Sequence, residues 1–260
     1  MITSTSNQRI KEIVQLQKKS KARNTEGIFI VEGIRMVREI PEDKLKALYV
    51  TEEFYKKHKT DLPGNVKPEL VTPTVFSYIS DTKTPQGVLA IVWQNKYVLS
   101  DILNRKKEKE DLLLVLDNLQ DPGNLGTIFR TAEAAGVTGI ILSKDCVDIY
   151  NPKVIRSTMG AIFRMPFVYV EQLTDTINEL KKNKIQVYAA HLAGKNAYDE
   201  EDYLGGTAYL IGNEGNGLRQ EVAECADTWI RIPMEGAAES LNAAVAASVL
   251  MFEASRQRRK

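Results

Sequence analysis

Asn118-Leu-Gln-Asp-Pro-Gly-Asn-Leu-Gly-Thr-Ile-Phe-Arg130 is a polar stretch that contains a turn and follows the apolar run 112–116. A buried strand that ends in such a loop is typical of α/β proteins, which bind ligands beyond the carboxyl ends of parallel strands. Two later stretches repeat the arrangement: Leu210-Ile-Gly-Asn-Glu-Gly-Asn-Gly-Leu218 and Ile232-Pro-Met-Glu-Gly-Ala-Ala-Glu-Ser-Leu-Asn242. The three stretches together predict a ligand site assembled from strand ends.

Apolar runs recur after this first strand, at 139–142, 167–170, 186–190, 208–211 and 229–232. Helical stretches separate most of them, which predicts a mostly parallel sheet covered by helices on both faces.

The N-terminal part of the chain contains its own strand candidates, at 27–31, 48–50, 69–71 and 87–92. Helices are expected at 7–19 and 33–40. We therefore predict a smaller α/β domain over 1–93, a polar linker over 94–110 and a larger domain over 111–260.

Composition is that of a globular protein, with 43% hydrophobic and 27% charged residues among 260. No apolar run is long enough for a transmembrane helix, and the N-terminus lacks a signal-peptide core, so a cytoplasmic location is expected. Cys146 and Cys225 have no metal-ligand spacing. No metal site is therefore expected, and both cysteines are predicted to be buried apolar residues.

Net charge is +1, but residues 1–38 carry eight basic side chains against three acidic ones. Such a cluster is either a solvated helix face or a phosphate-binding patch. On the second interpretation the RNA-binding candidates are Arg9, Lys18, Lys19, Lys21, Arg23 and Arg35. The basic tail 256–260 is weaker evidence, because cations are favourable at any helix C-terminus.

The first loop is predicted to open a helix capped by Asn124, since Asn favours N-cap positions. Its buried stripe would be Leu125, Ile128, Phe129, Ala132 and Ala135, with Gly136 ending the helix. Arg130 lies off this stripe, so it faces either a site or solvent. A plain cap and an ordinary surface arginine remain the alternative explanation.

The glycines of the second loop, Gly212, Gly215 and Gly217, permit positive φ and close approach of a ligand. Their spacing is wrong for a dinucleotide fingerprint, and the first loop lacks the lysine of a P-loop. A tight turn without a ligand remains possible.

Ser240 is predicted to open the C-terminal helix, whose buried stripe would be Leu241, Val245, Val249 and Phe252. A helix start with a hydroxyl, the Asn242 amide and free N–H groups can stabilise an alkoxide or a phosphate.

The three motifs, in this order, resemble those of the SpoU/TrmH branch of the SPOUT RNA ribose 2′-O-methyltransferases. The resemblance implies a parallel α/β sheet with a C-terminal trefoil knot, S-adenosylmethionine as cofactor, and a homodimer. By position it implies catalytic roles for Asn124, Arg130, Glu214, Ser240 and Asn242. It implies cofactor binding by Leu210, Ile211, Gly212, Ile232, Met234 and Leu241.

Gly27-Ile-Phe-Ile-Val-Glu-Gly33 and Thr84-Pro-Gln-Gly-Val88 are similar to the small RNA-binding domain that precedes many such catalytic domains. The stretch 157–161 is similar to a family segment near the site. The expected reaction is methyl transfer to a ribose 2′-hydroxyl of structured RNA, with ribosomal RNA favoured over transfer RNA. A non-catalytic RNA-binding protein and an unrelated nucleotide-binding enzyme are the competing interpretations.

In this reaction Arg130 is expected to stabilise the oxyanion and position a phosphate, because a guanidinium stays protonated and is a poor base. A substrate phosphate or water would then accept the proton. The family's alternative assignment, Arg130 as the base itself, stays open.

Overall fold

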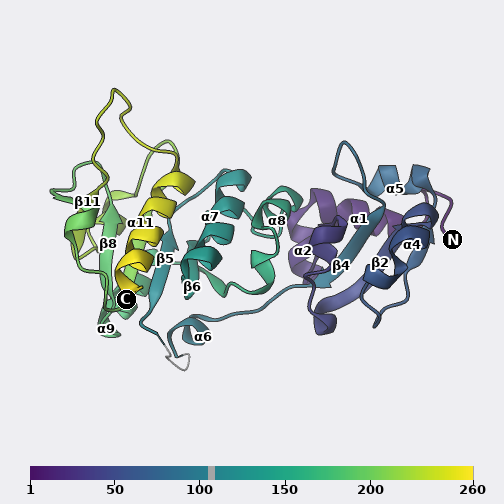
Figure 1. Cartoon of the computed structure of the whole chain (residues 1–260), viewed down its shortest axis with the longest axis horizontal. Coiled ribbons are helices and arrows are strands. Elements are labelled where there is room, and N and C mark those ends of the chain that lie inside the picture. Colours follow the sequence, from purple (N-terminus) through teal and green to yellow (C-terminus); the bar gives the residue numbers. More distant parts are fainter. Residues whose placement is uncertain (105–108, 260) are drawn as a thin grey trace. The chain divides into compact units, whose positions relative to one another are not determined.

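The computed structural model describes residues 1–104 and 109–259, which form two compact units. The first unit contains Met1–Asn95 and Asp148–Phe163, and the second contains the described residues of Lys96–Val147 and Arg164–Lys260. Figure 1 labels their elements.

A four-stranded sheet of order β1-β4-β2-β3 forms the centre of the first unit. Strand β4 (Val88–Trp93) pairs antiparallel with both β1 (Ile28–Glu32) and β2 (Leu45–Thr51). Strand β3 (Glu69–Val71) pairs parallel with β2. These strands occur where the sequence predicts them.

The helices of the first unit are α1 (Gln8–Lys18), α2 (Ser20–Glu26), α3 (Ile34–Val37), α4 (Glu52–His58), α5 (Pro73–Ile79) and α8 (Pro152–Thr158). The predicted helix 33–40 is shorter than expected, since only α3 is α-helical there. Apolar faces of α1 and α5 pack on alternate residues of β1, such as Ile28 and Ile30. Helix α8 also packs against β1, and the Phe29 and Tyr150 rings lie 4.7 Å apart.

Residues 148–163 therefore group with the first unit, which differs from the predicted domain of residues 111–260. The reason is tertiary: Asp148 forms a 2.5 Å ion pair with the buried Arg23, and Tyr150 packs on Phe29. A local pattern shows that a helix has an apolar face but not which sheet that face covers.

The predicted linker 94–110 also differs from the structure. It contains α6 (Leu99–Leu103), and Ile102 and Leu103 are buried in the core of the second unit. Residues 105–108 of that linker lie outside the described residues.

The second unit is built on a parallel sheet of order β7-β6-β5-β10-β8-β11-β9. Its strands are β5 (Leu112–Leu116), β6 (Gly139–Ser143), β7 (Phe167–Val170), β8 (Gln186–Ala190), β9 (Asn196–Ala197), β10 (Thr207–Ile211) and β11 (Thr228–Arg231). The predicted parallel sheet is confirmed, with the short β9 added.

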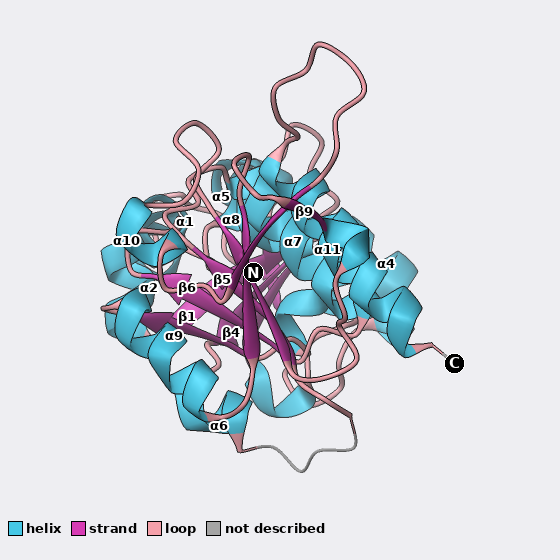
Figure 2. Cartoon of the chain, turned by 90° about the vertical axis from the view of Figure 1, so that its left-hand side faces the viewer, coloured by secondary structure: helices cyan, strands magenta, loops and turns pink. Residues whose placement is uncertain are grey.

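Helices cover both faces of this sheet (Figure 2). Helices α7 (Pro122–Ala135) and α11 (Ala243–Arg258) pack together on one face. Helices α9 (Leu173–Lys182) and α10 (Gln220–Ala223) share a core with α6 on the other. Within the part of the chain that the structure describes, no helix is both long and apolar enough to cross a membrane.

Candidate active site

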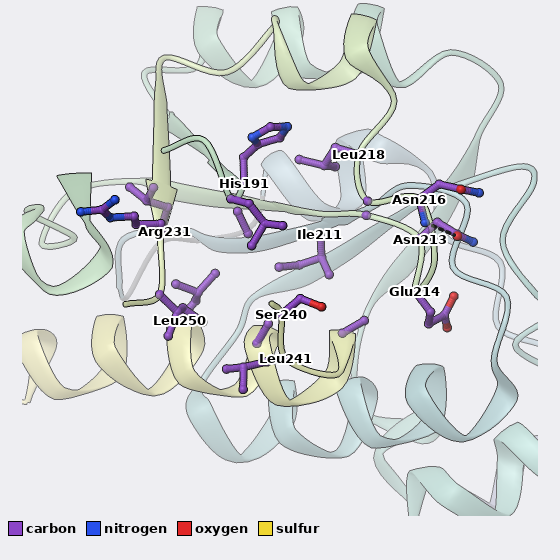
Figure 3. A pocket seen from close by; sticks show the side chains of 18 of the residues that line it. His191, Ile211, Asn213, Glu214, Asn216, Leu218, Arg231, Ser240, Leu241 and Leu250 are labelled. Atoms are coloured by element: carbon purple, nitrogen blue, oxygen red, sulfur yellow. Dashed lines mark hydrogen bonds between the residues drawn. The ribbon is translucent and has the colours of Figure 1, made fainter. Parts of the chain in front are cut away.

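A cavity of about 310 Å³ opens at the carboxyl ends of β8, β10 and β11 (Figure 3). Four segments contribute its wall: the end of β8 with 191–192, the loop 211–218, the segment 230–234, and the start of α11 from Ser240. Parallel strands end here on one edge of the sheet, which is where open α/β folds bind their ligands.

Five of the six predicted cofactor residues line this cavity: Ile211, Gly212, Ile232, Met234 and Leu241. Leu210 does not. It is fully buried in the core shared with α9 and α10. Successive strand residues point to opposite faces, and the side chain of Leu210 lies on the face that α9 and α10 cover.

The loop 212–217 is closed on itself. Asn213 and Gly217 exchange two backbone hydrogen bonds of 2.9 Å, and Asn213 Oδ1 accepts from the N–H groups of Gly215 and Asn216. A Cβ on Gly212 would lie 2.1 Å from the carbonyl carbon of Gly217. The loop therefore requires glycine at 212 for its own closure, as well as for any ligand.

Glu214 extends from this loop to the start of α7. Its carboxylate accepts hydrogen bonds from Gln120 N (3.1 Å), Asp121 N (2.9 Å) and Asn124 Nδ2 (3.0 Å). Burial raises the pKa of Glu214, but the hydrogen bonds from Asn124, Asp121 and Gln120 outweigh it and hold that pKa below its ordinary value. The second motif thus holds the N-terminus of the first motif's helix.

Asn124 and Asn242 connect the first motif to the third. Asn242 Oδ1 accepts from Ala244 N (2.9 Å) and Val245 N (3.3 Å), and its Nδ2 donates to Asn124 Oδ1 (2.9 Å). Because a carboxylate only accepts and helix N–H groups only donate, the orientation of both amides is fixed. We call Glu214, Asn124 and Asn242 the amide row.

Two predicted caps are wrong. Asp121, rather than Asn124, caps α7, because its side chain accepts from Asn124 N at 2.8 Å. Asn242, rather than Ser240, caps α11. In both cases the predicted residue lies close to the true cap, and the amide of Asn124 is thereby free to join the row.

Arg130 and Ser240 lie outside the amide row. Ser240 lines the cavity but is exposed, and Arg130 is exposed on α7. Neither side chain has a hydrogen bond to any residue within 1–104 or 109–259. Six residues along a helix place Arg130 about 120° around the axis from Asn124.

Sequence reasoning missed several cavity residues, among them His191, Asn213, Asn216, Leu218 and Arg231. The ring of His191 stacks on Trp229 with centroids 4.2 Å apart. His191 directly follows β8, and Arg231 ends β11. Their positions at strand ends are the signal by which they could have been found.

Four of the RNA-binding candidates, Lys18, Lys19, Lys21 and Arg35, are exposed. Arg9 is exposed too and forms an ion pair with Glu69. The prediction that Arg23 contacts RNA is wrong, because its side chain is 3% exposed and donates to Leu16 O and to Asp148. A buried arginine needs such partners.

The two cysteines differ: Cys146 is buried as predicted, and Cys225 is half-buried. Across the described residues, no group of three or more His, Cys, Asp or Glu could hold a metal ion.

Known families match both units. The SpoU rRNA methylase family matches residues 111–252, and an MRM3-like substrate binding domain matches residues 7–90. The chain is similar to the 23S rRNA (guanosine(2553)-2′-O)-methyltransferase RlmP of Bacillus subtilis (strain 168), with 33% identity over 255 residues. That match covers 96% of this chain and 97% of the relative.

Solved structures agree over nearly the whole chain. An rRNA methyltransferase from Sinorhizobium meliloti has a TM-score of 0.85 at 33% identity and covers 98% of this chain and 96% of its own. The SpoU methyltransferase AviRb from Streptomyces viridochromogenes, in complex with AdoMet, has a TM-score of 0.86 at 26% identity, with 97% and 98% covered. The chain therefore belongs to the SpoU rRNA methylase family.

Proposed function

We propose that this chain transfers a methyl group from S-adenosylmethionine to a ribose 2′-hydroxyl of ribosomal RNA. The observation that carries the proposal is the amide row, which joins all three motifs beside the cavity. A protein that only binds RNA has no need of such a row. The name of the Bacillus subtilis relative supports ribosomal RNA as the substrate.

The cavity suits S-adenosylmethionine in size and chemistry. Its volume of about 310 Å³ lies in the range of ligand pockets. Ile211, Leu218 and Leu250 provide apolar surface for an adenine ring, and the backbone of the 212–217 loop and Asn216 provide polar partners. When bound, the cofactor supplies an electrophilic methyl group on a sulfonium. The protein then has to bind the RNA, orient the ribose 2′-hydroxyl and allow its proton to leave.

The amide row can orient the ribose. One N–H of each amide is committed within the row, which leaves a second N–H on Asn124 Nδ2 and on Asn242 Nδ2 for a substrate oxygen. The N-terminus of α11 adds a favourable potential for developing negative charge. Ser240, at the cavity wall, supplies a hydroxyl for the same task.

Arg130 is assigned to the oxyanion and to an adjacent phosphate, which a guanidinium can bind with two hydrogen bonds. A substrate phosphate or water accepts the proton. This assignment rests on the resemblance of the first motif. It also rests on the Arg130 guanidinium, which has no hydrogen bond or ion pair within the described residues.

A homodimer is also part of the proposal. Val245 and Phe252, on the solvent side of α11, are 49% and 43% exposed, and Val249 between them is partly exposed. Exposed apolar stripes of this kind are typical of protein interfaces. Arg130 lies on the exposed side of α7, in the same helix layer, so a second copy covering this layer would lie close to it.

The trefoil knot and the domain roles complete the proposal. Strand β10 lies between β5 and β8, which both precede it in the chain, and this order supports a threaded C-terminal segment. We assign residues 1–93 to RNA binding through Lys18, Lys19, Lys21 and Arg35. Residues 94–110 connect the two units, with α6 packed in the core of the second. Residues 111–260 are assigned to catalysis, except 148–163, which pack with the first unit. The reaction would take place in the cytoplasm.

The test is transfer of tritiated methyl groups into unmodified ribosomal and transfer RNA pools. We expect label in ribosomal RNA only, at riboses that resist alkaline cleavage. Arg130→Ala should lose transfer and keep cofactor binding, whereas Arg259→Ala, another exposed arginine of this unit, should retain both. Label confined to transfer RNA, or wild-type turnover in Arg130→Ala, would contradict the proposal.

A further inference from the structure

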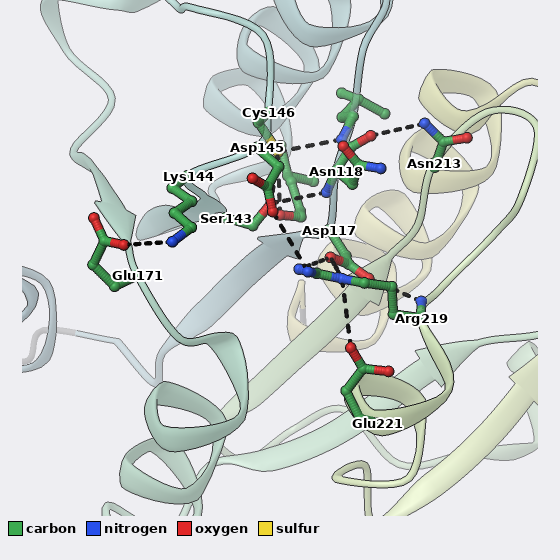
Figure 4. Close-up of polar contacts among 12 residues, drawn as sticks. Asp117, Asn118, Ser143, Lys144, Asp145, Cys146, Glu171, Asn213, Arg219 and Glu221 are labelled. Atoms are coloured by element: carbon green, nitrogen blue, oxygen red, sulfur yellow. Dashed lines mark hydrogen bonds and ion pairs between the residues drawn. The ribbon is translucent and has the colours of Figure 1, made fainter.

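A buried carboxylate lies at the carboxyl end of β5, next to β10 in the sheet. The side chain of Asp117 is 1% exposed and accepts three hydrogen bonds from one residue, Arg219 (Figure 4). Arg219 N donates to Oδ2 (2.9 Å), while Arg219 Nε (2.8 Å) and Nη2 (2.5 Å) donate to Oδ1. The ion pair thus fixes both the main chain and the guanidinium of Arg219.

Arg219 stands at the end of the loop that forms one cavity wall. It follows Leu218, which lines the cavity, and directly precedes α10 at the N-cap position. The beginning of the same loop is fixed to the same strand end, because Asp117 N donates to Ile211 O (2.8 Å) and Asn213 Nδ2 donates to Asn118 O (2.8 Å). Residues 117–118 therefore hold the loop 212–218 at both of its ends.

The loop between these anchors is internally bonded. Its Asn213–Gly217 backbone hydrogen bonds close it, and the close approach of Gly212 to Gly217 leaves no space for a side chain at 212. Glu214 projects from this loop and holds the start of α7 through Gln120, Asp121 and Asn124. A shift of the loop against β5 would move the cavity wall and the amide row together.

We propose that Asp117 and Arg219 are a positioning pair for methyl transfer, which sets the loop 212–218 against the end of β5. The pair touches neither the cavity nor the amide row, and it acts through Leu218 and Glu214. This inference rests on the proposed function and adds two residues to the machinery of the same site.

The alternative is that the Asp117–Arg219 pair only stabilises the fold. The variants must distinguish this stabilising role from the positioning role. Arg219→Lys keeps the charge and loses the planar fork that holds Oδ1 from two nitrogens. Asp117→Asn/Arg219→Gln removes both charges, so no unpaired carboxylate remains buried. The matched control is Lys181→Gln, which breaks a 2.8 Å ion pair with Asp227 in the same unit and lines no part of the cavity.

The measurements are kcat and KM for S-adenosylmethionine in the tritium assay, the calorimetric Kd for the cofactor, and urea unfolding. A displaced site of this kind costs roughly ten- to a hundred-fold in rate. We expect such a loss in kcat, with a raised KM and Kd for the cofactor, in Arg219→Lys and in the double variant. Lys181→Gln should lose only stability.

The inference is overturned if Arg219→Lys and the double variant match Lys181→Gln in kcat, KM and Kd. If one variant does not fold, the other decides by the same comparison. A wild-type protein that binds the cofactor and methylates neither RNA pool would contradict the proposed substrate. Even then, an unchanged Kd in the Arg219 variants would overturn the positioning role, and a raised Kd would support it.

Discussion

At the scale of residues, the site depends on the direction of its hydrogen bonds. The amide row runs from donors at the start of α11 to the acceptor Glu214, and each asparagine both accepts and donates. An aspartate at either position has no N–H to donate. The row therefore explains why two amides, rather than two carboxylates, connect the three motifs.

Asn124→Asp tests this direction. It places a carboxylate next to the Glu214 carboxylate, where Asn124 Nδ2 now donates at 3.0 Å. We expect methyl transfer to fall by about 100-fold, the usual cost of losing one positioned donor at a site of developing charge. Thr127→Ala, an exposed change on the same helix, is the control. Unchanged kcat in Asn124→Asp would show that the row is not needed for the reaction.

Glu214 also predicts how stability depends on pH. Its folded pKa lies below its ordinary value of 4.5, so its contribution to stability is fully present above that value. The contribution is lost as pH falls through the folded pKa. Urea unfolding should therefore show Glu214→Gln as less stable than the wild type at neutral pH, with the difference shrinking at more acid pH. A constant difference across this range would refute the linkage.

At the scale of elements, α11 is the least expected helix. The predicted stripe Leu241, Val245, Val249 and Phe252 is wrong, since Val245 and Phe252 are exposed. The buried face consists mainly of small residues, Ala243, Ala244, Ala247 and Ala254, with Leu250 and Met251. Alanines let the helix pack closely beside α7 and β10. The stabilisation from this close packing outweighs what burial of the larger side chains Val245 and Phe252 would give.

The exposed stripe of α11 gives a direct test of the homodimer. Phe252→Glu places a charge in the proposed interface, where desolvation would be costly. Light scattering coupled to gel filtration should give the mass of a dimer for the wild type and of a monomer for Phe252→Glu. Arg259→Glu, beyond the stripe, should leave the dimer intact. A monomeric wild type would refute the interface.

The C-terminal end of α11 is held by Arg258 rather than left to solvent. Its guanidinium donates to the carbonyls of Tyr203 (2.8 Å), Asp111 (3.0 Å) and Gly205 (2.5 Å). Burial lowers the pKa of Arg258. The predicted basic tail is therefore partly structural, and Lys260 of that tail lies outside the described residues.

Arg258→Gln should destabilise the protein by about 2 kcal/mol, because hydrogen bonds to a charged donor are lost and carbonyls are left unsatisfied. Arg256→Gln is the control, since that side chain is 64% exposed and its ion pair is with Glu253 in the same helix. Glu253 is itself 9% exposed, but it keeps the hydrogen bond from Gln257 Nε2 (2.8 Å) when Arg256 is replaced, so we expect a loss of about 1 kcal/mol or less. Equal losses of unfolding free energy in urea would contradict the anchoring role.

At the scale of the whole molecule, the site exists only in the folded second unit. The residues that line its cavity come from separate segments between Ala190 and Leu250, and the amide row joins Asn124 to Asn242, 118 positions apart. A cofactor that binds only this arrangement must stabilise it. At a concentration 100 times its Kd, S-adenosylmethionine should add about 2.7 kcal/mol to the free energy of unfolding.

Thermal melts measure this stabilisation. S-adenosylmethionine and S-adenosylhomocysteine should raise the melting temperature, while ATP and NAD should leave it unchanged. A shift with ATP or NAD alone would favour the unrelated nucleotide-binding enzyme.

Local sequence patterns were enough to predict the strands of both units except the short β9, the buried stripe of α7 with its terminal Gly136, and the order of the three motifs. These features depend on the local period of apolar residues and on glycine at positive φ, which neighbouring residues decide. The tertiary structure alone decided which distant residues meet. It paired Asn242 with Asn124, turned Leu210 away from the cavity, and buried Arg23 against Asp148. It also placed 148–163 in the first unit and put the alanines of α11 inside. Such choices depend on close packing and on partners far along the chain, which no local pattern contains.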